Sequence, residues 1–134
     1  MAGIYLNIPF CRRKCHYCNF FSQASLKYRL PLLEALGEET FLQRDYLAGK
    51  PVRSVYLGGG TPSILEPDEI GKLLSAIRGT YAVEADAEIT IEVNPDDVTP
   101  AVLAAYREAG INRISIGVQS FFDEDLDYLN RIHN

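Results

Sequence analysis

The chain has 134 residues, of which 47% are hydrophobic and 23% are charged, a globular composition that excludes a disordered or collagen-like chain. With 13 Lys and Arg against 18 Asp and Glu, its formal net charge is -5, so we expect no general binding of nucleic-acid phosphates. No apolar run is long enough to cross a membrane and no leader-like segment is recognisable, which predicts a cytoplasmic protein without a membrane span.

Four short runs rich in β-branched residues are predicted as strands, and each is followed by a stretch with helical character. The predicted strands cover residues 4–8, 54–57, 88–93 and 113–118, and the predicted helices cover residues 30–47, 67–78, 100–109 and 123–131. Alternation of strand and helix four times over predicts an α/β fold with a parallel sheet and right-handed crossovers.

Local signals support the predicted helices. Pro31 is suited to a first helical turn, Thr99 to an N-cap and Gly110 to a helix stop. Between residues 70 and 77, apolar side chains recur with the i, i+3, i+4, i+7 spacing of an amphipathic helix.

Apolar and polar side chains alternate along the first, third and fourth predicted strands. In the third strand, for example, Ile89 and Ile91 share one face, while Thr90 and Glu92 share the other. A sheet that is covered on both faces usually reads as continuously apolar, so the polar faces are expected to line a ligand-binding lumen. Ligands collect at the carboxyl ends of parallel strands, and the unusual residues of this chain follow those ends.

All three cysteines lie between residues 11 and 18, directly after the first strand, with C-x3-C-x2-C spacing. An odd number of cysteines in a reducing compartment argues against a structural disulfide. Thiolates at this density favour an iron–sulfur cluster, with zinc or unligated thiols as alternatives. Zinc needs a fourth ligand, but His16 is too close to the cysteines, and His133 is remote and expected on the surface. The basic residues 12–14 would offset the cluster's negative charge or simply be solvated.

Three further features lie at strand ends. The run Gly58-Gly59-Gly60-Thr61-Pro62 is either a tight turn or a place where the backbone approaches a charged ligand closely. Glu92 ends the third strand as a solvated side chain or a ligand contact, and Gln119 follows the fourth strand.

The cysteine segment after a first strand, with Tyr17 just before the last cysteine, resembles the radical S-adenosylmethionine (SAM) superfamily. The resemblance implies that Cys11, Cys15 and Cys18 ligate a [4Fe–4S] cluster whose fourth iron binds SAM. It further implies that an electron from the reduced cluster cleaves SAM to methionine and a 5′-deoxyadenosyl radical. By the same resemblance, contacts to SAM are implied for Tyr5, Tyr17, Gly59, Gly60, Thr61, Glu92, Gln119 and Arg131.

Over nearly its whole length the chain resembles one subgroup, oxygen-independent coproporphyrinogen III oxidase and the heme chaperone of radical SAM type. The motifs that carry this resemblance are YLNIPFC at 5–11, GGGTPS at 58–63, EVNP at 92–95 and GVQSF at 117–121. The family barrel has six βα units followed by a C-terminal domain. Residues 1–134 are therefore expected to form the N-terminal part of a radical SAM core domain, a partial barrel with about four of the six units.

Two departures distinguish the two members of the subgroup. The oxidase carries a further cysteine two residues after the third cluster cysteine, where this chain has Phe20, and a longer segment before its first strand. Both departures favour the heme chaperone type, which hands heme to an acceptor protein. The alternatives are an oxidase that converts propionates to vinyls through the 5′-deoxyadenosyl radical, and a truncated, inactive fragment.

The resemblance also implies partners. The small-molecule partners are SAM and either heme or a porphyrinogen, and the protein partners are an electron donor and a heme acceptor. Heme is an expected ligand of the full-length protein. Enzyme activity is left open, and no catalytic acid–base residue is assigned.

Overall fold

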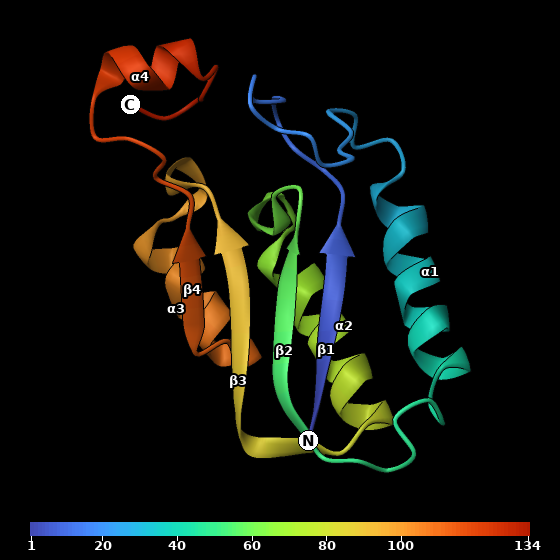
Figure 1. Ribbon diagram of the computed structural model, residues 1–134. Helices are drawn as coiled ribbons and strands as arrows, with labels where there is room; N and C mark the ends of the chain where they lie inside the picture. Colours follow the sequence, from blue (N-terminus) through green and yellow to red (C-terminus); the bar gives the residue numbers. More distant parts are fainter.

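The computed structural model describes residues 1–134 and contains one sheet of four parallel strands (Figure 1). The strands are β1 (Ala2–Ile8), β2 (Val52–Gly59), β3 (Val83–Val93) and β4 (Arg113–Ile116), and their order in the sheet is β1-β2-β3-β4. Each strand pairs with the next one along the chain. The predicted succession of parallel βα units is confirmed.

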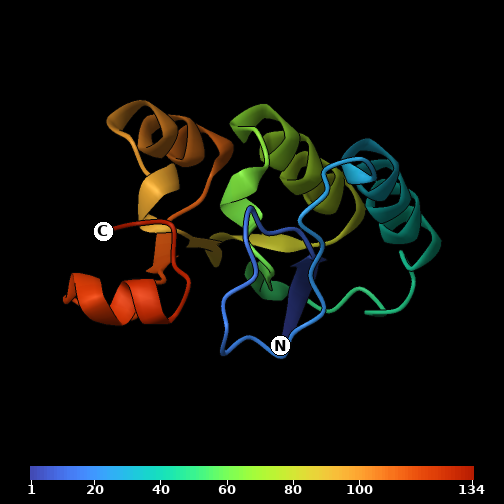
Figure 2. The same cartoon turned by 90° about the horizontal axis from the view of Figure 1, so that it is seen from above.

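Three helices cover one face of the sheet. They are α1 (Arg29–Leu42), α2 (Pro67–Thr80) and α3 (Pro100–Ala109), and α2 packs between the other two. Seen from above, all three lie along the same side of the sheet (Figure 2). The short helix α4 (Asp123–Tyr128) and the cysteine-bearing loop after β1 lie beyond the carboxyl ends of the strands (Figure 1). None of the helices combines the length and the apolar character needed to span a membrane.

The sequence signals for α2 and α3 are confirmed by the structure. Thr99 caps α3 by accepting a hydrogen bond from the Val102 backbone N–H at 3.2 Å, and Gly110 ends the helix with a φ of 96°. The apolar stripe of α2 is buried against the sheet; it consists of Ile70, Leu73, Leu74 and Ile77.

The two faces of the sheet differ as the alternation predicted. Ile89, Ile91 and Val93 are buried under the helices, whereas Tyr5 on the opposite face is 59% exposed. Ile116 departs from the pattern, because it lies on the apolar face and is nevertheless 50% exposed. The reason is its place at the edge of the sheet, since the helix that follows β4 lies beyond the strand ends rather than against that face (Figure 1).

Several elements end earlier than predicted. The first helix stops at Leu42 instead of residue 47, and the chain then turns back to β2 through Ala48 and Gly49, which both have positive φ. The fourth strand stops at Ile116, and α4 stops at Tyr128. Gln119 after β4 and Asn130 after α4 both have positive φ. These two turns place the predicted site residues Gln119 and Arg131 beside the strand ends.

Tyr106 in α3 predicts a specific pH dependence of stability. Its side chain is 1% exposed and its hydroxyl has no hydrogen-bond partner. Burial, together with the charges of Asp97 and Glu66, raises its pKa to about 12 from 10.0. Since the unfolded chain loses this proton first, the stability contributed by neutral Tyr106 is fully present below pH 10 and is lost as the pH rises toward 12.

Replacing Tyr106 with phenylalanine is expected to remove this alkaline loss, which amounts to about 2 kcal/mol. At pH 7 the variant should be at least as stable as the wild type, because the deleted hydroxyl is buried without a partner. Urea unfolding at pH 7, 10 and 11.5 measures both effects. The exposed Tyr46 provides a control, and Tyr46→Phe should leave the pH profile parallel to that of the wild type. An unchanged alkaline slope in Tyr106→Phe would contradict the assignment.

Candidate cofactor site

The loop that carries the cysteines is fixed at its base to the rest of the sheet. The Cys11 N–H donates to the Gln23 carbonyl at 3.0 Å, which closes the loop where it leaves and re-enters the body of the chain. The Gly60 and Thr61 N–H groups donate to the carbonyls of Ile8 and Phe10 at 2.8 and 2.6 Å. The glycine loop (residues 58–61), which begins at the end of β2, therefore continues the pairing of β2 with β1 into the cysteine loop.

The glycines are required by this close approach. A Cβ atom on Gly60 would lie 2.6 Å from the Phe10 carbonyl oxygen, and one on Gly59 would collide with the Asn7 side chain. Gly59 also has a φ of 111°, which L side chains rarely adopt. Close contact with β1 and the cysteine loop is thus sufficient to explain why both positions are glycine.

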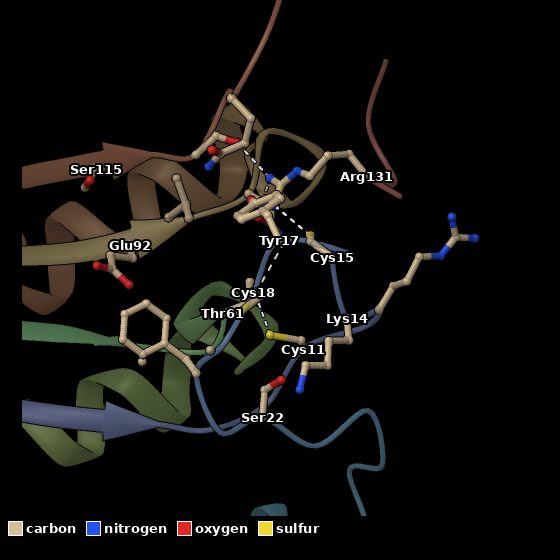
Figure 3. Close-up of a pocket in the computed structure, with 18 of the residues that line it drawn as sticks. Cys11, Lys14, Cys15, Tyr17, Cys18, Ser22, Thr61, Glu92, Ser115 and Arg131 are labelled. Carbon is tan, nitrogen blue, oxygen red and sulfur yellow. Dashed lines mark hydrogen bonds between the residues drawn. The ribbon is translucent and has the colours of Figure 1, made fainter. Parts of the chain in front are cut away.

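A cavity of about 360 Å³ lies where the cysteine loop, the glycine loop and the ends of β3 and β4 meet (Figure 3). It brings together residues that are far apart in the sequence. Tyr5 lies outside it and lines an adjoining cavity with Glu92 and Gly59. Every other predicted site residue lines the main cavity: Cys11, Cys15, Tyr17, Cys18, Gly59, Gly60, Thr61, Glu92, Gln119 and Arg131.

The three cysteines are free thiols, each partly buried. Thr61 Oγ1 donates to Cys11 Sγ, and Arg131 Nη1 donates to Cys15 Sγ, both at 3.4 Å. No three His, Cys, Asp or Glu side chains of the chain are close enough together to hold a single metal ion. The thiols instead share the wall of one cavity with Lys14 and Arg131. Soft thiol donors around a space of this size, with cations beside them, fit an iron–sulfur cluster.

Arg131 connects three of the loops around the cavity. Besides Cys15 it contacts the Tyr17 hydroxyl at 3.4 Å, and its Nη2 donates to the Asn94 side chain at 3.0 Å and to the Gly117 carbonyl at 2.7 Å (Figure 3). Asn94 in turn donates to Thr61 Oγ1 at 3.5 Å. Asn94 was not among the predicted site residues, although the alternation that places Thr90 and Glu92 on the lumen face points to it as the next residue.

Glu92 lies among tyrosines on the open face of the sheet. Its Oε1 accepts a hydrogen bond from the Tyr56 hydroxyl at 2.8 Å, and the Tyr5 ring stacks on that of Tyr56 at 5.8 Å between centroids. The hydrogen bond to Glu92 raises the pKa of Tyr56, whereas partial burial is the main cause that raises the pKa of Tyr5. Both phenols are therefore neutral at physiological pH, and the Tyr56 hydroxyl donates to one of the two carboxylate oxygens of Glu92.

The far side of the cysteine loop rests on the turn after α4. The His16 N–H donates to the Leu129 carbonyl at 3.2 Å, and His16 Nδ1 lies 2.9 Å from the Tyr128 carbonyl. Asn130, which has a φ of 59°, donates to the Lys14 carbonyl and accepts from Arg13. The His16 ring is thus engaged with the backbone outside the thiol cavity.

One histidine differs from its prediction. We expected His133 on the surface, but it is 8% exposed, and its Nε2 lies 2.9 Å from the Val118 carbonyl. The chain after α4 folds back against the segment that follows β4, and this return buries the ring.

Comparison with known proteins identifies the family. The family model of the radical SAM superfamily matches residues 6–134, which is nearly the whole chain. The chain belongs to this superfamily. A [4Fe–4S] cluster and SAM are the cofactors that membership implies, and the resemblance stated from the motifs is confirmed at the level of the superfamily.

Comparison with individual relatives indicates which subgroup of the superfamily the chain is related to. The heme chaperone HemW of Escherichia coli is 43% identical over 98% of this chain and 35% of its own length. The mitochondrial radical S-adenosyl methionine domain-containing protein 1 of Bos taurus is 38% identical over 99% of this chain and 30% of its own length. The chain thus spans about a third of the length of these relatives.

A solved structure confirms the fold. Coproporphyrinogen III oxidase (HemN) from Escherichia coli, described as a radical SAM enzyme, superimposes with a TM-score of 0.90 and 34% identity over 98% of this chain and 31% of that one. The chain is therefore related to both the heme chaperones and the oxidase, and its four parallel βα units follow the radical SAM fold.

Proposed function

We propose that this protein binds a [4Fe–4S] cluster through Cys11, Cys15 and Cys18, binds SAM beside it, and acts in heme metabolism as a heme chaperone that delivers heme to an acceptor protein. The observation that carries the proposal is the convergence of the three thiols, the glycine loop, Glu92 and Arg131 on one cavity. A cytoplasmic location, an electron-donor protein and an acceptor protein are parts of the same proposal.

The residues of the cavity match the groups of SAM in chemical type. A cluster with SAM supplies a strongly reducing electron and a carbon radical when both are bound. The Arg131 guanidinium offers positive charge for a carboxylate, and Glu92 offers an acceptor for an amino group. Tyr5 and Tyr17 provide aromatic faces beside the cavity, to which an adenine ring can stack.

The choice of the chaperone over the oxidase rests on Phe20. This side chain lines the main cavity at the position where the oxidase type carries its additional cysteine. A phenyl ring can neither ligate a metal nor exchange a proton, so a reaction that relies on that cysteine has no substitute for it here. The oxidase reaction, and a fragment without either function, remain as the alternatives to be tested.

The first test concerns SAM. After anaerobic reconstitution and reduction, added SAM is expected to change the electron paramagnetic resonance spectrum of the cluster, because it binds an iron without a protein ligand. Glu92→Gln keeps the shape of the side chain and should weaken the SAM-dependent change, whereas Glu84→Gln at the far end of β3 should not. A cluster spectrum that SAM leaves unchanged in the wild type would contradict SAM binding.

The second test separates the chaperone from the oxidase. The protein is incubated with dithionite, SAM and coproporphyrinogen III, and is titrated separately with heme. Heme binding without vinyl products supports the chaperone, whereas vinyl products would establish the oxidase. Failure to bind heme and to turn over would leave the inactive fragment as the correct description.

A further inference from the structure

Asp97 is a buried carboxylate that no predicted function uses. It ends η2 (Pro95–Asp97), just after β3, and its side chain is 3% exposed. A buried carboxylate is costly unless cations and hydrogen-bond donors surround it. The partners of Asp97 therefore show which parts of the fold depend on it.

The partners come from two other loops. Asp97 Oδ2 accepts a hydrogen bond from Ser63 Oγ at 2.7 Å, and Ser63 Oγ accepts one from the Asn94 N–H at 3.2 Å. Ser63 lies in η1 (Pro62–Ile64), directly after the glycine loop. Asp97 Oδ1 lies 2.8 Å from Arg12 Nη2, and this contact is an ion pair rather than a directed hydrogen bond.

Arg12 stands between the first two cysteines, and its side chain is 55% exposed. The exposed Arg12 side chain thus pairs with the Asp97 carboxylate, which is almost inaccessible to water. The arginine loses little when it moves away, but the carboxylate would be left buried and uncompensated. This asymmetry ties the cysteine loop to the loop after β3.

We propose that Asp97 is a positioning residue for the cysteine loop, and that through Arg12 it holds the backbone at Cys11 in place before any cluster is bound. The inference rests on the proposed function in one respect, because a Cys11 backbone held in place before cluster binding is useful only if the protein assembles a cluster. The opposite side of the loop is held separately by Asn130, so loss of the Asp97 contact is expected to loosen the Cys11 side first.

The test measures amide hydrogen exchange in the cluster-free protein. Asp97→Asn keeps the shape and an acceptor for Ser63 but removes the charge that holds Arg12, and it should speed exchange at the Cys11 amide about tenfold. The His16 amide, which bonds to Leu129 on the far side, should change less. Amides of Ile89 and Ile91 in the core report global stability and should stay protected.

Variants of Arg12 distinguish positioning from a general structural role. Arg12→Met should speed exchange at Cys11 at least as much as Asp97→Asn, because it also leaves the buried carboxylate without its cation. Arg12→Lys should keep most of the protection, and the double variant Arg12→Met with Asp97→Asn should be no looser than Arg12→Met alone. The double variant also removes the stranded charge, so it is expected to fold even where a single variant is unstable. Glu84→Gln removes a carboxylate from another arginine pair, at the start of β3, and should leave the loop unchanged.

Unchanged exchange at Cys11 in Asp97→Asn, independent effects of the two single variants, or equal acceleration in loop and core would each overturn the proposal. The exchange experiment needs no cluster, so its failure is distinguishable from failure of the proposed function. As a second readout, a reconstituted cluster should be lost to a chelator several-fold faster in Asp97→Asn than in Glu84→Gln.

Discussion

Serine in place of Cys11, Cys15 or Cys18 is expected to abolish retention of the iron–sulfur cluster. The wild-type protein should hold about four irons per chain after anaerobic reconstitution and absorb broadly near 400 nm. Each substitution replaces a soft thiolate with a hydroxyl that stays protonated and binds iron weakly. Because the chain has three cysteines and all three line the cavity, no other thiol can replace the lost one.

Iron and sulfide analysis together with absorbance measures this effect. Ser22→Ala is the matched control, since Ser22 lines the same cavity and its replacement leaves all thiols in place. Its iron content should equal that of the wild type. Zinc in the wild-type protein, or full iron content in a single serine variant, would disprove the assignment of the three ligands.

Alanine at Gly60 is expected to destabilise the fold by about 2–3 kcal/mol, because its Cβ overlaps atoms that cannot rotate away. The Cβ would lie 2.6, 2.9 and 3.0 Å from the O, N and C atoms of the Phe10 backbone. Relief requires separation of the glycine loop from the cysteine loop, so the variant should also assemble the cluster poorly. Urea unfolding of the cluster-free protein measures the stability part alone.

Gly37 provides the opposite control for the same substitution. It lies within α1, and a Cβ there would meet no atom within 4 Å. Gly37→Ala should therefore stabilise the protein by about 0.5–1 kcal/mol, since alanine has the higher helix propensity. Equal effects of the two substitutions would show that the contact with Phe10 is not what excludes a side chain at position 60.

Most of the fold could be predicted because its signals are local. The period-2 alternation in residues 88–93, the cap at Thr99 and the stop at Gly110 reflect the stereochemistry of a few neighbouring residues. The same holds for the C-x3-C-x2-C spacing, which places three thiols on one short loop beside the same cavity. For that reason the family, and the residues that it implies as cofactor contacts, could be predicted from the sequence. The roles of those residues stay predictions.

Element ends and buried polar partners were not accessible in this way. Helix α4 ends at Tyr128, before the predicted residue 131, because the turn after it bonds to the cysteine loop more than a hundred residues earlier in the chain. His133 is buried for a similar reason, because the end of the chain folds back against the segment around Val118, 15 residues earlier, whose carbonyl the His133 ring contacts. The residues at which these elements end therefore depend on contacts between segments that are distant in the sequence.

The sequence by itself determined the parallel βα succession, the positions of the thiols and the radical SAM family, since each is written in short-range spacing and motif. Only the tertiary structure decided that Arg131 reaches Cys15 across 116 residues, and that Ser63 and Arg12 meet at Asp97. The physical reason is that parallel strands end at one edge, where loops distant in sequence share a small volume. There each buried charge or hydrogen-bonding group finds its partners among whichever loops the sheet brings together.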